Sequence, residues 1–127
     1  MRFVEGLSNF KFVALDAAIQ RVLLVRGLDL VRTEWLRPLG GGLHEFRLRH
    51  TRSEIERMFG DGTRSTDSPR ERVLLRVFVH FYGGRVVLLL GGFDKGRFPG
   101  RKRQDREIAR ARRSLAQFKA RGRRGRP

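Results

Sequence analysis

Two stretches of this 127-residue sequence carry arginines an even number of residues apart, with apolar residues at positions in between. Residues 43–49 read LHEFRLR, and residues 72–82 read RVLLRVFVHFY. Successive side chains of an extended strand point to opposite faces. Arg47 and Arg49 of the first stretch would therefore share one face with Arg76 of the second, if the two strands lie in one sheet. Guanidinium groups fit phosphate oxygens, so the pattern predicts a surface that binds a phosphodiester backbone.

Cleavage of RNA without a metal needs a base for the 2′-hydroxyl, donors for the charged phosphorus centre and an acid for the leaving 5′-oxygen. Arginine stays protonated, so we assign Arg47, Arg49 and Arg76 to phosphate binding and transition-state stabilisation. Lys95 is a candidate proton donor or phosphate clamp, because neighbouring cations would lower its pKa. His80 falls on the Arg76 face and titrates near neutrality. It is either the general base or an ordinary exposed histidine.

Further candidates surround these residues in the sequence. Asp94 either orients Lys95 or Arg97 or caps a turn. An exposed sheet face must be polar in any case, but a face without function would usually mix charges of both signs. Glu45 is the only acid among the inferred outward positions of the two strands, which favours a functional surface. The predicted RNA-binding residues beyond the catalytic set are Arg72, Asp94, Arg97, Arg101, Lys102 and Arg103.

The composition indicates an anionic partner. Apolar residues make up 39% of the chain, and the net charge is +16 with an isoelectric point near 11.8. We expect one domain over residues 1–120 and a disordered basic tail over 121–127. Fourteen Lys or Arg follow from position 95 onward, against Asp105 and Glu107. These cations are either the solvated face of a helix or an arm that binds nucleic acid non-specifically.

Other classes of protein are disfavoured. There is no cysteine, and the three histidines are scattered, so no zinc site is expected. No carboxylate cluster suggests a metal-dependent nuclease, and we predict neither metal nor cofactor. The longest apolar run, residues 86–90, is far shorter than the roughly 20 residues that span a bilayer. No signal-peptide pattern opens the chain. We therefore predict a cytoplasmic protein without a membrane partner.

The first half of the chain predicts one long helix and one strand. Apolar spacing predicts a packing helix over 9–26, with Ser8 as its N-cap and Gly27 as its stop. A short helix or turn is expected at 30–36, with Trp35 anchoring the core. The glycines at 40–42 predict a flexible lead into the strand at 43–49. They do not predict a phosphate loop, because no Lys-Ser/Thr follows.

The second half predicts two more strands and a terminal helix. Residues 51–70 form a long loop with a short helix at 53–59. A strand at 72–82, a tight turn at Gly83-Gly84 and a strand at 85–93 form a hairpin. The last strand is apolar on both faces, which favours a central position. The helix at 103–120 has an apolar stripe of Ile108, Ala111, Leu115 and Phe118, and the fold class is α+β.

The order of these segments resembles the RelE/ParE superfamily of toxins, most closely its HigB-like, phage-derived branch. The resemblance rests on GLHEFR at 42–47, RVF at 76–78, VLLLGGFDK at 87–95 and REIARARRSL at 106–115, and it covers residues 11–120. It implies a RelE-like fold, similar to microbial ribonucleases. In this fold an N-terminal helical segment and a C-terminal helix pack on a small antiparallel sheet with an open basic face.

The resemblance also implies a function. Members are toxins of type II toxin–antitoxin systems that cleave mRNA on the ribosome with a metal-free site of Arg and Lys. A cognate antitoxin, typically a helix-turn-helix protein from a neighbouring gene, silences them. This chain departs from the family in its turn at 94–99, in its longer segment at 51–70 and in its weak or absent amino-terminal strand. The alternative is a non-catalytic basic protein that binds nucleic acid or the ribosome.

Overall fold

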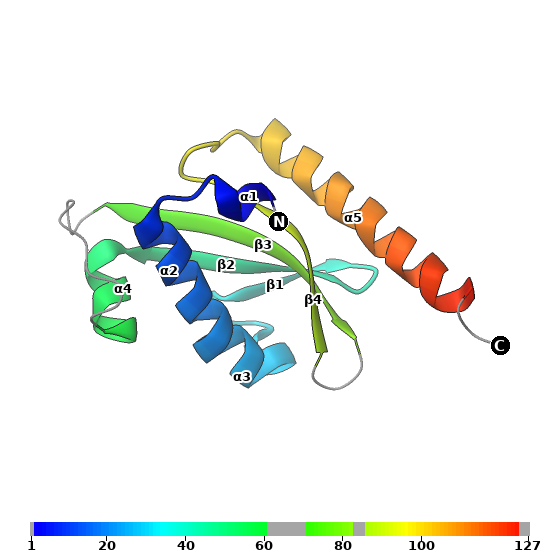
Figure 1. Cartoon of the computed structure of the whole chain (residues 1–127), viewed down its shortest axis with the longest axis horizontal. Helices are drawn as coiled ribbons and strands as arrows, with labels where there is room; N and C mark the ends of the chain where they lie inside the picture. Colours follow the sequence, from blue (N-terminus) through cyan, green and yellow to red (C-terminus); the bar gives the residue numbers. More distant parts are fainter. Residues whose placement is uncertain (1, 61–70, 83–85, 125–127) are drawn as a thin grey trace.

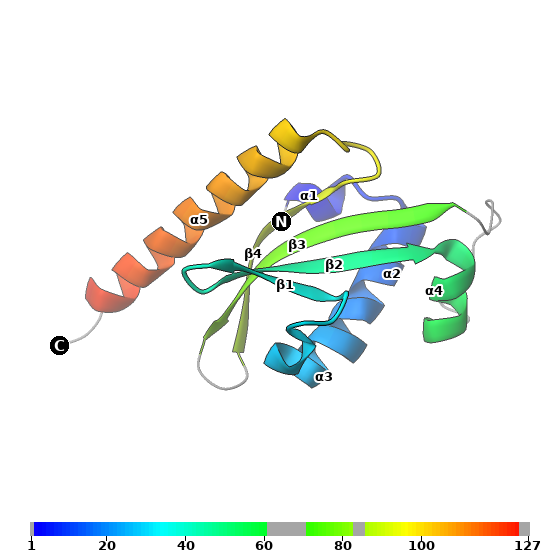
Figure 2. The ribbon, with the colours of Figure 1, turned by 180° about the vertical axis from the view of Figure 1, so that it is seen from behind.

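The computed structural model describes residues 2–60, 71–82 and 86–124 as an α+β fold built on one four-stranded antiparallel sheet (Figure 1). The strands β1 (Leu36–Gly40), β2 (Leu43–Thr51), β3 (Arg72–Tyr82) and β4 (Val86–Asp94) lie in the order β1-β2-β3-β4. The N-terminal helices lie on one side of the sheet and α5 (Arg101–Arg124) on the other, as the two opposite views show (Figures 1 and 2). The predicted class, α+β with an antiparallel sheet, is confirmed.

The N-terminal helical segment forms as predicted. It comprises α1 (Arg2–Glu5), α2 (Asn9–Ala18), a π-helical turn (Ile19–Leu23) and α3 (Leu24–Arg26), followed by a 3-10 turn (Gly27–Leu30). The Ser8 hydroxyl caps α2 by accepting from the Lys11 amide, at 3.3 Å. Gly27 ends the segment with a φ of 52°, a value that glycine adopts without strain.

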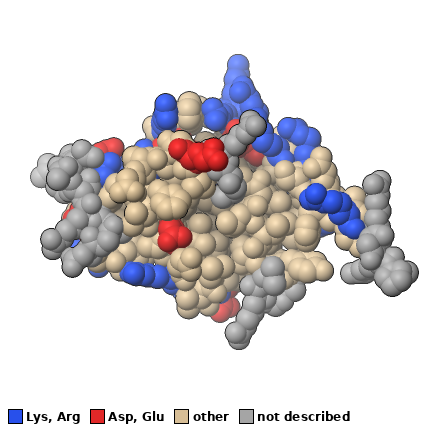
Figure 3. Space-filling model, viewed as in Figure 1, with Lys and Arg blue, Asp and Glu red and all other residues tan. Residues whose placement is uncertain are grey.

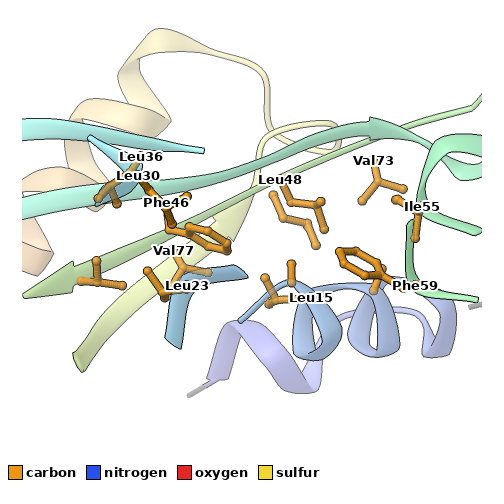
Figure 4. Close-up of a cluster of buried hydrophobic side chains, with 14 residues drawn as sticks. Leu15, Leu23, Leu30, Leu36, Phe46, Leu48, Ile55, Phe59, Val73 and Val77 are labelled. Atoms are coloured by element: carbon orange, nitrogen blue, oxygen red, sulfur yellow. The ribbon is translucent and has the colours of Figure 1, made fainter. Parts of the chain in front are cut away.

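The main core lies between this helical segment and the sheet (Figure 4). Leu15 and Leu23 of the helices contact the odd-numbered apolar residues of β3 and the even-numbered residues Phe46 and Leu48 of β2. Helix α4 (Arg52–Phe59) closes one end with Ile55 and Phe59, and its N-terminus is fixed by a capping box between Thr51 and Glu54. Trp35 stacks on Phe46 with ring centroids 5.8 Å apart, which confirms it as a core anchor.

A second core forms on the opposite face, where an open basic surface was predicted. The stripe of α5 packs through Ala111 and Leu115 on Leu43, Phe78 and Phe93 of the sheet. Helix α5 therefore covers the part of this face around Phe78, and the prediction of an open basic face is wrong for that part. The physical reason is that Phe78 lies on the same face of β3 as Arg76. Burial of Phe78 under α5 removes its apolar surface from water and stabilises this packing.

Three further predictions are corrected. Strand β1 was not expected, and the glycines at 40–42 make its tight turn to β2, with φ values of 90°, 64° and 84°. Strand β4 is an edge strand and is not central. Both of its faces are covered, because Phe3 of α1 packs over Gly92 on one side and α5 packs on the other. Helix α5 also begins two residues earlier than expected and continues to Arg124, into the segment predicted to be a disordered tail.

Some predicted segments lie outside the described residues: the loop at 61–70, the turn at Gly83-Gly84 and residues 125–127. The hairpin itself is confirmed by the pairing of Tyr82 with Val86. In the described part of the chain, none of the helices combines the length and apolar character of a membrane-spanning helix. The face that carries α2 is mostly uncharged, with Lys and Arg at its rim (Figure 3).

Candidate phosphate-binding site

The alternating arginines of β2 and β3 share one face of the sheet, as their spacing predicted. Arg47 lies directly opposite Arg76 in the antiparallel register, and Arg49 lies opposite Leu74. Side chains in such directly opposed positions have Cβ atoms about 5 Å apart, and like charges there reduce stability. The repulsion between Arg47 and Arg76 therefore lowers the stability of the fold, and an anionic ligand would offset it.

Glu45 keeps Arg76 in place beneath this face. The two side chains are almost fully buried, with residue exposures of 1% and 4%, and their Oε1 and Nε atoms are 3.6 Å apart. Arg76 also donates from Nη1 to the Leu75 carbonyl, at 3.2 Å. Arg76 is thus a buried, ion-paired residue, whereas Arg47 is half-buried and Arg49 is exposed. Of these three arginines, Arg47 and Arg49 are the ones that solvent reaches.

Lys95 reaches the same site from the end of β4. Its Nζ donates to Gln104 Oε1 of α5 at 3.0 Å, and Gln104 Nε2 donates to Glu45 Oε2 at 3.2 Å. A continuous polar chain thus links Lys95 through Gln104 and Glu45 to Arg76. We call Arg47, Arg49, Arg76 and Lys95 the cationic cluster.

The pKa values of the cluster reflect burial and crowding of like charge. Burial is the main cause that lowers the pKa of Arg76, to about 10, although Glu45 opposes the shift. The pKa of Lys95 is also lowered, first by burial and then by the positive charge of Arg76. Burial, followed by the charge of Arg49, lowers the pKa of Arg47. A bound anion would raise the pKa of all three groups.

Two buried donors of the cluster have no hydrogen-bond acceptor among the described residues. They are the Nε atoms of Arg47 and Arg76. Buried polar groups in native proteins nearly always have partners, so each exception needs an explanation. An oxyanion seated between the opposed guanidinium groups would supply acceptors for donors of this kind.

Two residues predicted for the site lie elsewhere. His80 shares the face of Arg76, but it lies two side-chain repeats along β3, about 13 Å away, beyond Phe78. Its Nδ1 lies 2.8 Å from the Gly42 carbonyl, and its ring contacts Phe118 of α5. Asp94 faces the opposite side of the sheet, where it pairs with Lys11 at 2.6 Å. It also accepts from the Arg97 amide, so the turn-capping alternative holds.

The remaining predicted RNA-binding residues do not all lie at the cluster. Arg101 lines a hollow that also contains Lys95. Arg97 and Arg103 lie on the ring of Phe98, with Arg103 Cζ 4.2 Å from its centroid. Arg72 is exposed at the start of β3, and Lys102 is exposed on the first turn of α5. The structure thus gathers Arg47, Arg49, Arg76 and Lys95 and places Arg101 beside them.

Sequence reasoning missed Arg37 and Gln104. Arg37 lies opposite Glu45 on β1 and faces the cluster, but β1 itself was not predicted. Gln104 reaches the cluster because α5 packs on this face, and the sequence did not indicate that packing. Glu45 was noted as the lone outward acid, which was the available sign that it balances a buried arginine.

No three His, Asp or Glu among the described residues lie together as a metal site would require. Comparisons of the chain with protein-family models, with curated proteins and with solved structures find no match.

Proposed function

We propose that this chain is a metal-free endoribonuclease that cuts mRNA on the ribosome, as the toxin of a type II toxin–antitoxin system. The observation that carries the proposal is the convergence of Arg47 and Arg76, from opposed strands, with Lys95 beside them. The ribosome and the antitoxin as partners rest on the sequence resemblance described above, as does a RelE-like fold. The cationic cluster supports the chemistry.

In this proposal, the scissile phosphate lies on Arg47 and Arg49, over the buried guanidinium of Arg76. The 2′-oxygen attacks phosphorus, and its proton leaves to water. The P–O5′ bond breaks, leaving a 2′,3′-cyclic phosphate and a 5′-hydroxyl. Lys95 gives its proton to the departing 5′-oxygen, a role that its lowered pKa favours. The arginines stabilise the extra negative charge of the phosphorane.

The absence of a histidine beside the cluster explains why the chain would need the ribosome. His44 and His50 lie on the face of β2 that packs toward α2, and His80 is distant along β3. Without an obvious base among the described residues, the rate must come from positioning of the 2′-hydroxyl in line with the phosphate. A ribosome that holds the message in a fixed conformation can provide this positioning.

The same observation favours one alternative, a non-catalytic protein that binds RNA or the ribosome through the cationic cluster. Such a protein would keep Arg47 and Arg49 as phosphate ligands and would need no proton donor. The two functions differ in their dependence on Lys95 as an acid.

Induced expression in a bacterium tests the proposal. We expect growth arrest with the wild-type chain and its loss with Arg47→Ala plus Lys95→Ala. Arg26→Ala, which removes an exposed arginine of α3 on the other face, serves as the control and should still arrest growth. Co-expression of a helix-turn-helix protein from an adjacent gene should relieve the arrest. Arrest that survives loss of Arg47 and Lys95 would contradict the proposed site.

A further inference from the structure

A hollow of about 400 Å³ lies between β1, the loop after β4 and the first turns of α5. We call it the Asp105 pocket. Its volume falls within the range of 300–1,000 Å³ typical of small-ligand pockets. Lys95 belongs both to this pocket and to the cationic cluster, so a ligand in the pocket adjoins the phosphate site.

The walls of the pocket suit a nucleotide. Leu39, Pro99 and Ile108 give it an apolar surface, on which a flat base can lie. Leu39 and Ile108 are themselves packed against the second core, so this surface is held in place. Arg37, Lys95 and Arg101 supply the positive charge that a sugar–phosphate backbone needs.

Asp105 does not fit a pocket that binds phosphate alone. It is exposed and has no ion-pair partner in the part of the chain that the structure describes, although Arg101 precedes it by one helical turn. A carboxylate repels phosphate and can only accept hydrogen bonds when ionised. A ligand that contacts Asp105 must therefore present hydrogen-bond donors to it, and N–H groups of a base are such donors.

We propose that the Asp105 pocket binds the base next to the scissile phosphate and selects guanine. This inference rests on the proposed function, because it places the base beside the cationic cluster. Among the four RNA bases, only guanine carries two adjacent donors, N1–H and N2–H₂, on its Watson–Crick edge. A carboxylate accepts both at once, whereas adenine, cytosine and uracil each offer it one donor group. Single-stranded bases are commonly read on this edge.

The test measures binding of RNA that cannot be cut. Fluorescein-labelled 2′-O-methyl pentanucleotides of sequence UUXUU, with each of the four bases as X, are titrated against the full chain by fluorescence anisotropy. A bidentate contact contributes at least about fivefold to discrimination between bases. We expect UUGUU to bind wild type more tightly than the other three by this factor or more.

Asp105→Asn should reduce the preference for guanine to within twofold, while the affinity for UUUUU falls by no more than twofold. Asp16→Asn is the matched control, since it removes one exposed acid from α2, on the other side of the sheet. It should keep the preference. Thermal unfolding of both variants checks that they are folded.

Equal affinity for the four oligonucleotides, preference for another base, or a guanine preference that survives Asp105→Asn would each overturn the proposal. Failure of the nuclease proposal looks different. A chain that prefers UUGUU but neither arrests growth nor cuts mRNA keeps the base pocket and loses the catalytic function. A chain that cuts mRNA without base preference keeps the catalytic function and loses the base pocket. A chain that binds none of the four oligonucleotides contradicts both proposals.

Discussion

The buried pair of Glu45 and Arg76 should be the most sensitive point of the cationic cluster. Glu45→Gln keeps the size of the side chain and an oxygen that can accept from Gln104, but it removes the charge that opposes Arg76. Both residues are nearly inaccessible to solvent. The variant therefore leaves a guanidinium that is buried beside Arg47 without a counter-charge.

The expected loss follows from the geometry. Removal of one partner of a buried ion pair costs about 3–5 kcal/mol. The Nε–Oε1 separation of 3.6 Å is longer than a good hydrogen bond, so we expect a loss of about 3 kcal/mol in the free energy of unfolding. Arg76→Met in the same chain removes the stranded charge. The double variant should recover at least half of the loss.

Urea unfolding followed by circular dichroism measures both variants. With a slope of about 1.5 kcal/mol/M for a domain of this size, the midpoint for Glu45→Gln should fall by about 2 M. Asp16→Asn provides an exposed control, with a change within about 0.5 kcal/mol. A loss below about 1 kcal/mol for Glu45→Gln, or a double variant equal to the sum of the two single ones, would refute the role given to this pair.

Three further predictions follow. Because the pKa of Lys95 is lowered, the affinity for a 2′-O-methyl RNA should begin to fall at a pH below the ordinary 10.5. Lys95→Arg should weaken this fall without abolishing it, since the pKa of Arg76 is also lowered, to about 10; an unchanged profile would contradict the charge assigned to Lys95. Gly92→Ala would place a Cβ 2.5 Å from the Arg76 carbonyl oxygen, so the free energy of unfolding in urea should fall by about 1–3 kcal/mol. Gly100→Ala, with open space around it, should be nearly neutral, and similar losses for the two variants would contradict this prediction. Arg112→Ala removes hydrogen bonds to the Leu39 and Gly40 carbonyls; it should lower the free energy of unfolding by about 1 kcal/mol and speed amide exchange in α5. Arg113→Ala should do neither, and equal effects of the two substitutions would contradict the role of Arg112 in holding α5 to β1.

The pairing of β2 with β3 could be predicted because their residues alternate with period 2. Alternation places Arg47 and Arg49 on one face of β2 and Arg76 on one face of β3, and the register Arg47↔Arg76 makes these the same face of the sheet. The pairing of β3 with β4 followed from the short hairpin between them, whereas the register of β2 against β3 was not predicted, because the long segment at 51–70 does not fix it. The N-terminal helix followed equally well, from its apolar spacing and its cap at Ser8.

The cover that α5 provides could not be assigned from its stripe alone. Leu115 and its neighbours predicted a buried face, but periodicity does not say against which surface a helix packs. The sequence of β3 did carry an indication of this cover, because the apolar residues Leu74 and Phe78 alternate with Arg76 on the face that was expected to be polar. Strand β1 was missed because Pro38 and the following glycines disfavour an ordinary strand. An edge position, where Pro38 need not donate to a second neighbour, allows it.

The cations of the candidate site could be predicted from the sequence, whereas the buried ion pair that neutralises Arg76 could not. Arg47 and Arg49 were found from the alternation along β2, and Lys95 from its place just after β4. The burial of Arg76 depends on Glu45 and on the α5 residue Gln104, which is distant in the sequence. His80 was assigned to the site because it shares the face of Arg76, although two side-chain repeats of the strand separate the two residues by about 13 Å.

Cleavage of mRNA on purified ribosomes tests the central claim most directly. Mapping of 5′-hydroxyl ends compares wild type with Arg47→Ala plus Lys95→Ala, and with Arg26→Ala plus Arg57→Ala, which removes two exposed arginines from α3 and α4. We predict that the first pair lowers the cleavage rate by at least about 100-fold, while the second stays within twofold of wild type. Equal rates for the two double variants would contradict the account.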